Sequence, residues 1–94
     1  MNQDELVRTI QSVGMTTFVK YFTAFLDLSI SSEDLVDGLI KIAKYGNNSA
    51  KTKVNSARRI IKNSLVMEAL EIISKSNNIE HWVVQKAAHL LEKE

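Results

Sequence analysis

The sequence predicts an all-α protein, with five or six helices arranged as stacked antiparallel hairpins, like a short α-solenoid. A compact helical bundle is the alternative. Three observations predict this class. Apolar residues recur at helical spacings of three and four, no segment alternates as a strand would, and residues 35–64 reappear in weakened form as residues 65–94. With 94 residues, 45% of them hydrophobic, and no proline, the chain is expected to form one domain around one core.

The internal repeat has an offset of 30 residues, a period typical of stacked helical hairpins. It divides the chain into an N-terminal hairpin or cap (1–30), a first repeat (31–63) and a second repeat (64–94). The identical pairs are Leu35/Leu65, Val36/Val66, Ile42/Ile72, Asn47/Asn77, Asn48/Asn78, Val54/Val84 and Ala57/Ala87.

The first 30 residues are expected to form two helices. The first begins after Met1 or Asn2 and ends at Gly14, which adopts a left-handed conformation at little cost. The second spans about 16–28 and is the main anchor of the core, unless part of its aromatic face contacts a second copy in a homodimer. Its apolar residues at helical spacing are Phe18, Tyr21, Phe22, Phe25 and Leu26.

Each repeat is expected to pair a helix of about twelve residues with a longer one. In the first repeat, the spacing of Ser31 and Asp34 indicates a capping box at the start of a helix that ends near residue 45 and includes Ile42 in a wide apolar face. A turn at 46–48 then leads to a helix over 49–63. In the second repeat, Ser64 caps a helix over about 65–76, and a turn at 77–78 leads to a helix over 79–92.

The alternating helices of residues 33–92 carry a small residue at Ala57 and Ala87, each followed by an aliphatic pair, Ile60–Ile61 or Leu90–Leu91. In this respect the segment resembles the HEAT and armadillo families of helical repeats. The resemblance implies a scaffold that binds protein or nucleic-acid partners.

Positive charge is concentrated in the middle of the chain, although the formal net charge is only +1. Residues 38–67 contain no acid and have a local charge of +7. The basic residues of this segment are Lys41, Lys44, Lys51, Lys53, Arg58, Arg59 and Lys62.

On a helical projection, Lys51, Asn55, Arg58 and Lys62 follow one flank of the helix over 49–63, and Arg59 lies on its outer side. The positions of the second repeat aligned with this flank are His81, Gln85, Ala88 and Glu92, so packing of the repeat does not require the charge. The flank is a solvated face, a surface for an acidic protein, or a ridge that contacts phosphates. In a helix-turn-helix interpretation, Lys51 and Lys53 would lie at the leading end of a recognition helix.

Trp82 aligns with Thr52 and has no aromatic counterpart in the first repeat. It either packs against the preceding helix or is an exposed anchor for a partner. The predicted partner-binding residues are therefore Lys51, Lys53, Asn55, Arg58, Arg59, Lys62 and Trp82.

The sequence gives no indication of an enzyme, a cofactor or a metal site. It has no cysteine, only three glycines, and two histidines, His81 and His89, without a ligand partner at four residues. No apolar run approaches a membrane span, and the acidic start does not resemble a secretory signal, so a cytoplasmic location is expected.

These observations predict a non-enzymatic macromolecule-binding module. Its expected partner is a protein with an acidic surface, and the alternative is DNA or RNA, with phosphates contacted by Lys51, Arg58, Arg59 and Lys62. Replacing Arg58, Arg59 and Lys62 together with alanine is expected to abolish binding and leave thermal stability nearly unchanged.

Overall fold

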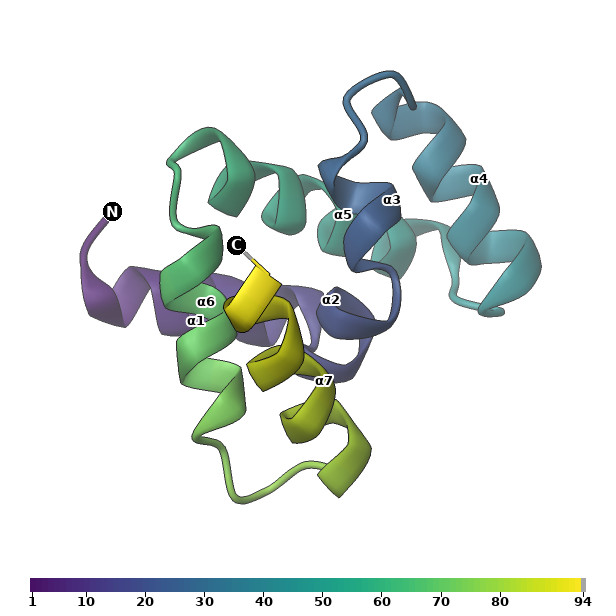
Figure 1. Ribbon diagram of the computed structural model, residues 1–94. Coiled ribbons are helices and arrows are strands. Elements are labelled where there is room, and N and C mark those ends of the chain that lie inside the picture. Colours follow the sequence, from purple (N-terminus) through teal and green to yellow (C-terminus); the bar gives the residue numbers. More distant parts are fainter. Residues whose placement is uncertain (94) are drawn as a thin grey trace.

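The computed structural model describes residues 1–93; residue 94, the last of the predicted second repeat, lies outside them. The described residues form seven α-helices and no strand (Figure 1). The all-α class is therefore confirmed, whereas the expected five or six helices were too few. No helix of this part of the chain is long and apolar enough to span a membrane. The helices are α1 (Gln3–Val13), α2 (Met15–Lys20), α3 (Phe22–Leu26), α4 (Ser32–Ile42), α5 (Asn47–Lys62), α6 (Val66–Ser74) and α7 (His81–Lys93).

Helix α1 has the predicted start and end. The side chain of Asn2 accepts a hydrogen bond from the N–H of Glu5 at 2.8 Å, which satisfies a backbone donor that the first turn leaves unpaired. Gly14 ends the helix with a φ of 89°, and its N–H donates to the carbonyl of Ile10 at 2.8 Å. Residues with a Cβ rarely adopt such a φ, so glycine is suited to this position.

The predicted second helix is two short helices, α2 and α3, because Tyr21 (φ −109°, ψ 24°) leaves the helical conformation between them. The prediction of an aromatic core anchor is confirmed, since Phe18 and Phe25 are fully buried and Phe22 nearly so. The ring of Phe18 meets that of Phe22 edge-on, with centroids 5.7 Å apart, and stacks on that of Phe25 at 6.3 Å.

Helix α4 begins as predicted, because the hydroxyl of Ser31 accepts a hydrogen bond from the N–H of Asp34 at 3.1 Å. Two details of the predicted first repeat are wrong. Asn47 and Asn48 belong to the first turn of α5, which starts directly after Gly46, and not to a turn before it. Ile42 is 73% exposed at the end of α4 and does not join the core.

The predicted cap at Ser64 is also wrong. Ser64 has a φ of 58° and follows the C-terminus of α5. Its N–H donates to the carbonyl of Ile61 at 3.0 Å, and the N–H of Leu65 donates to that of Ile60 at 3.1 Å. This pattern of hydrogen bonds is a Schellman motif, which commits Ser64 to ending α5. Leu65 therefore takes the position before α6, without a side-chain cap.

The helices pack as a compact globule, with extents of 30 × 26 × 24 Å. Helix α4 packs on α5, and α6 packs on α7, as the two predicted hairpins require. However, α5 and α6 make little direct contact, and α1 packs against α5 and also contacts α6. In Figure 1, α4 lies at one edge beside α5, and α7 faces the viewer. The predicted stack, capped by residues 1–30, is therefore not confirmed.

The equivalent alanines of the two repeats do occupy the core, since Ala57 and Ala87 are both fully buried. Burial differs at other aligned positions. Val54 is fully buried whereas its counterpart Val84 is half-buried, and Val83 takes the buried position in α7. The two hairpins thus share a pattern of small core residues without identical packing.

Candidate functional site

Helix α5 presents a polar and basic face to solvent. Its apolar side is fully buried through Ala50, Val54, Ala57 and Ile60. The other side exposes the following predicted site residues: Lys51, Asn55, Arg59 and Lys62. The helix therefore both fixes the core and positions the cations.

A hollow of about 600 Å³ lies along the C-terminal half of this face. We call it the basic hollow. Its lining contains three cationic side chains and no carboxylate. The lining residues are Leu28, Ser32, Asn55, Arg58, Arg59, Ile61, Lys62 and Asn63. Four of the seven predicted binding residues, Asn55, Arg58, Arg59 and Lys62, are thus brought together.

Arg58 forms part of the wall and is also a structural residue. Its Nη2 donates to the carbonyl of Ile30 at 2.8 Å and to that of Asp27 at 3.2 Å, which ties α5 to the loop between α3 and α4. Its Nε is buried and has no hydrogen-bond partner within the described residues. The expectation that Arg58 can be replaced without loss of stability is therefore not supported by its contacts.

Arg59 and Lys62 are the exposed cations of the hollow. Arg59 lies 3.6 Å from a carboxylate oxygen of Glu5 on α1, and both side chains are largely accessible to water. An ion pair of this kind contributes little to stability and is readily exchanged for another anion. Within residues 1–93, Lys62 forms no ion pair. Both cations are accessible to a ligand.

The loop between α3 and α4 forms the rim of the hollow. Leu28 is 72% exposed there and supplies an apolar contact at the rim. Asp27 accepts hydrogen bonds from the hydroxyl of Ser29 at 2.6 Å and from its N–H at 3.0 Å. The bonds from Ser29, with a smaller contribution from the charge of Arg58, lower the pKa of the Asp27 carboxyl below its ordinary value of 3.8.

Lys53 does not face the basic hollow. Its Nζ donates to the carbonyl of Val13 at 2.9 Å and lies 4.7 Å from the centre of the Tyr45 ring. A cation at the C-terminal end of α1 is favourable because the last carbonyls of a helix are partially negative. This contact directs Lys53 away from the role that a recognition helix would give it. Lys51 is exposed on α5 but outside the lining of the hollow.

Trp82 lies on a different part of the surface. It is 40% exposed in the first turn of α7, and its Nε1 donates to a carboxylate oxygen of Glu80 at 3.0 Å. In Figure 1 the start of α7 is at the bottom of the molecule, whereas α5 crosses the upper part. Trp82 is not among the residues that line the basic hollow, to which Arg59 and Lys62 belong.

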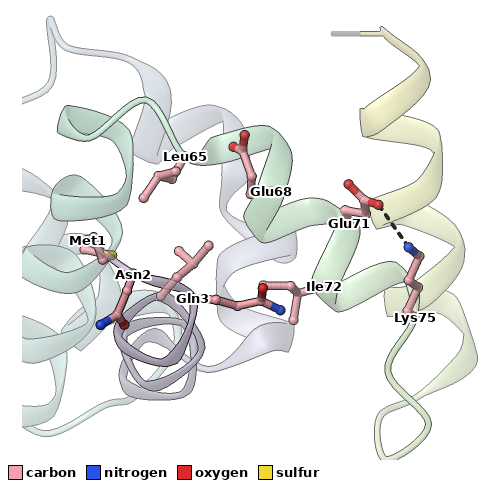
Figure 2. A pocket seen from close by; sticks show the side chains of 9 residues that line it. Met1, Asn2, Gln3, Leu65, Glu68, Glu71, Ile72 and Lys75 are labelled. Atoms are coloured by element: carbon pink, nitrogen blue, oxygen red, sulfur yellow. Dashed lines mark hydrogen bonds and ion pairs between the residues drawn. The ribbon is translucent and has the colours of Figure 1, made fainter.

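A second hollow, of about 360 Å³, lies between the start of α1 and helix α6. Figure 2 shows Met1, Asn2 and Gln3 on one side and residues of α6 on the other. Of its charged groups, Glu71 pairs with Lys75 at 2.9 Å, and Glu68 adds one negative charge. Leu6, Leu65 and Ile72 supply its apolar lining. This hollow has less unbalanced charge than the basic hollow.

The histidines are both exposed. Within residues 1–93, no three histidine, aspartate or glutamate side chains gather as a metal-ion site would require.

Sequence reasoning missed half of the lining of the basic hollow: Leu28, Ser32, Ile61 and Asn63. Leu28 and Ser32 belong to the α3–α4 loop and to the first turn of α4, and tertiary contacts place them there: α3 and α4 pack on α5, and Arg58 holds the loop. Asn63 directly follows Lys62 and lies in the predicted helix over 49–63, so the helical projection could have included it.

Comparison of the chain with protein-family models, with curated proteins and with solved structures gave no match. The basis for a functional proposal is therefore the basic hollow itself.

Proposed function

We propose that this protein is a non-enzymatic cytoplasmic binding module that holds an acidic protein partner in the basic hollow. The observation that carries the proposal is the charge of the lining, which has three cations and no carboxylate. Complementary charge speeds association and selects against partners of the same sign.

The rim of the hollow favours a protein over nucleic acid. Leu28 is 72% exposed, and Ile61 is half-buried beside the cations, so an aliphatic side chain of a partner has a contact there. The contacts of Lys53 and Arg58 within the molecule leave Lys51, Arg59 and Lys62 as the exposed cations of α5. A surface that binds a nucleic-acid backbone usually has more than three exposed cations.

Nucleic acid is the second candidate, because Lys51, Arg59 and Lys62 are exposed along one helix. A gel-shift titration with mixed DNA and RNA at two salt concentrations separates the candidates. Binding to phosphates gives a shift that weakens steeply as salt rises. We expect no shift at low salt.

The protein-partner proposal is tested by photo-crosslinking. A photoreactive residue replaces Asn63, which lines the hollow and is exposed, or Gln85, a matched exposed amide on α7. We expect a protein to be captured at position 63 and not at position 85, and the capture to be lost when Arg59 and Lys62 are also replaced with alanine. No protein captured at position 63, or the same proteins captured at both positions, would overturn the proposal.

A further inference from the structure

The donors that line the basic hollow match a ligand with more charge than a single carboxylate. Arg59 and Lys62 supply exposed positive charge, and Arg58 adds a third charge in the wall. Around them lie two further donors, the amide of Asn55 and the hydroxyl of Ser32. The amide of Asn63 already donates to the carbonyl of Arg59 at 2.8 Å. No carboxylate belongs to the lining, and Glu5 of α1 reaches Arg59 from outside it.

A phosphate monoester fits this set better than a carboxylate. It has a charge of about −1.5 to −2 at neutral pH and three acceptor oxygens, whereas a carboxylate has one charge and two oxygens. Arginine and lysine side chains together with neutral amide donors are the groups that satisfy such an ion. One carboxylate would leave most of these donors unused.

The apolar part of the lining decides between sources of the phosphate. Proteins that bind single-stranded nucleic acid commonly stack its bases on aromatic side chains. The lining of the basic hollow contains no aromatic residue, and its apolar members are the aliphatic Leu28 and Ile61. An aliphatic side chain next to a phosphorylated residue in a polypeptide matches this surface.

We infer that the basic hollow binds a phosphorylated serine or threonine of a partner protein, with an aliphatic neighbour of that residue against Leu28 and Ile61. The inference rests on the proposed function and specifies the chemistry of the partner. Arg59 and Lys62 contact the phosphate, the amide of Asn55 and the hydroxyl of Ser32 donate to its remaining oxygens, and Arg58 adds charge from the wall. The ion pair of Arg59 with Glu5 opens when the phosphate binds.

The test uses three immobilised peptide libraries that are randomised except for a fixed central residue, which is phosphoserine, serine or glutamate. We expect the full chain to be retained about tenfold better on the phosphoserine library than on the glutamate library, because the dianion uses a second charge-assisted contact. A double variant, Arg59→Ala with Lys62→Ala, loses this preference. A matched control, Lys86→Ala with Lys93→Ala, removes the same amount of charge from α7. We expect this variant to keep the preference for phosphoserine.

The other outcomes overturn the inference in distinguishable ways. Equal retention on phosphoserine and glutamate would refute the phosphate assignment and leave an acidic protein partner in place. No retention on any library, together with no protein captured at position 63, would refute the proposed function as well. Tighter binding of an oligouridylate than of the phosphoserine library would assign the hollow to nucleic acid. Circular dichroism of each variant verifies that it is folded.

Discussion

At the scale of single residues, Arg58 belongs both to the basic hollow and to the fold. Its guanidinium holds the α3–α4 loop through the carbonyls of Ile30 and Asp27. We predict that Arg58→Ala lowers the free energy of unfolding by about 1–3 kcal/mol, because the carbonyls lose a charged donor. Arg59→Ala changes it by less than about 0.5 kcal/mol, as is usual for an exposed side chain.

Urea denaturation of the two single variants measures this difference. Equal stability of Arg58→Ala and Arg59→Ala would show that the contacts of Arg58 with the loop contribute nothing. The consequence for design is that binding experiments should use Arg59 and Lys62, and should leave Arg58 in place.

Asp27 provides a pH-dependent test of the same loop. The hydrogen bonds from Ser29 lower its pKa below 3.8, so they stabilise the folded protein fully above the unfolded value of 3.8. This contribution is lost as the pH falls through the lower, folded pKa. We predict that NMR titration of the carboxyl gives a pKa below 3.8, and that Ser29→Ala raises it while leaving the backbone donor. An unchanged pKa in Ser29→Ala would contradict the stated cause.

Glu5 pairs with Arg59 at 3.6 Å, so under the proposed function it would compete with the ligand for this cation. We predict that Glu5→Gln strengthens binding of the acidic partner by about twofold, the effect of a few tenths of a kcal/mol for an exposed ion pair. Asp4→Asn is the matched control, since Asp4 is also an exposed acid in the first turn of α1. Equal strengthening by both variants, measured by calorimetric titration, would indicate a general effect of net charge.

At the scale of helices, the C-terminal end of α5 is set by the backbone conformation of Ser64. Ser64 adopts a left-handed conformation in the Schellman motif that ends this helix. We predict that Ser64→Gly stabilises the protein by about 0.5–1 kcal/mol, because glycine adopts a positive φ without the strain of a Cβ. Thermal unfolding measures the effect.

The control for Ser64→Gly is Ser56→Gly in the interior of α5. It is expected to destabilise the protein by about 0.5 kcal/mol, since glycine is a poor helix former. Two changes of the same sign would contradict the conformational explanation.

The ends of helices were predictable where a side chain of suitable chemistry marks them. They were not predictable where the conformation or hydrogen bonds of the backbone determine the end. Gly14 and Ser31 mark the ends of helices by their own chemistry, and the structure confirms both. The start of the first helix, expected after Met1 or Asn2, is fixed by the side chain of Asn2. The break at Tyr21 has no such signal, because the apolar spacing continues through it. Serine is a suitable N-cap residue, but the N–H of Ser64 donates to the carbonyl of Ile61 and so belongs to the end of α5.

At the scale of the whole molecule, the sequence predicted the helices of the two hairpins but not their arrangement. A repeat specifies which faces are apolar, and several packings bury the same faces. Here α1 packs on α5 and contacts α6, a set of contacts between distant segments for which local periodicity gives no signal. The cations of the hollow were predictable from the helical projection. Its aliphatic rim at Leu28 was not, since the packing of α3 and α4 on α5 and the hydrogen bonds of Arg58 place it there.

The central claim is that the basic hollow is the binding surface, and not merely a region of positive charge. The most direct measurement is the dissociation constant of the crosslinked partner for three proteins: the natural chain, Arg59→Ala with Lys62→Ala, and Lys86→Ala with Lys93→Ala. We predict that the first pair of substitutions weakens binding by about tenfold or more, and that the second, with the same loss of charge, changes it by less than about twofold. Equal weakening by both pairs, or no weakening by the first, would contradict the claim.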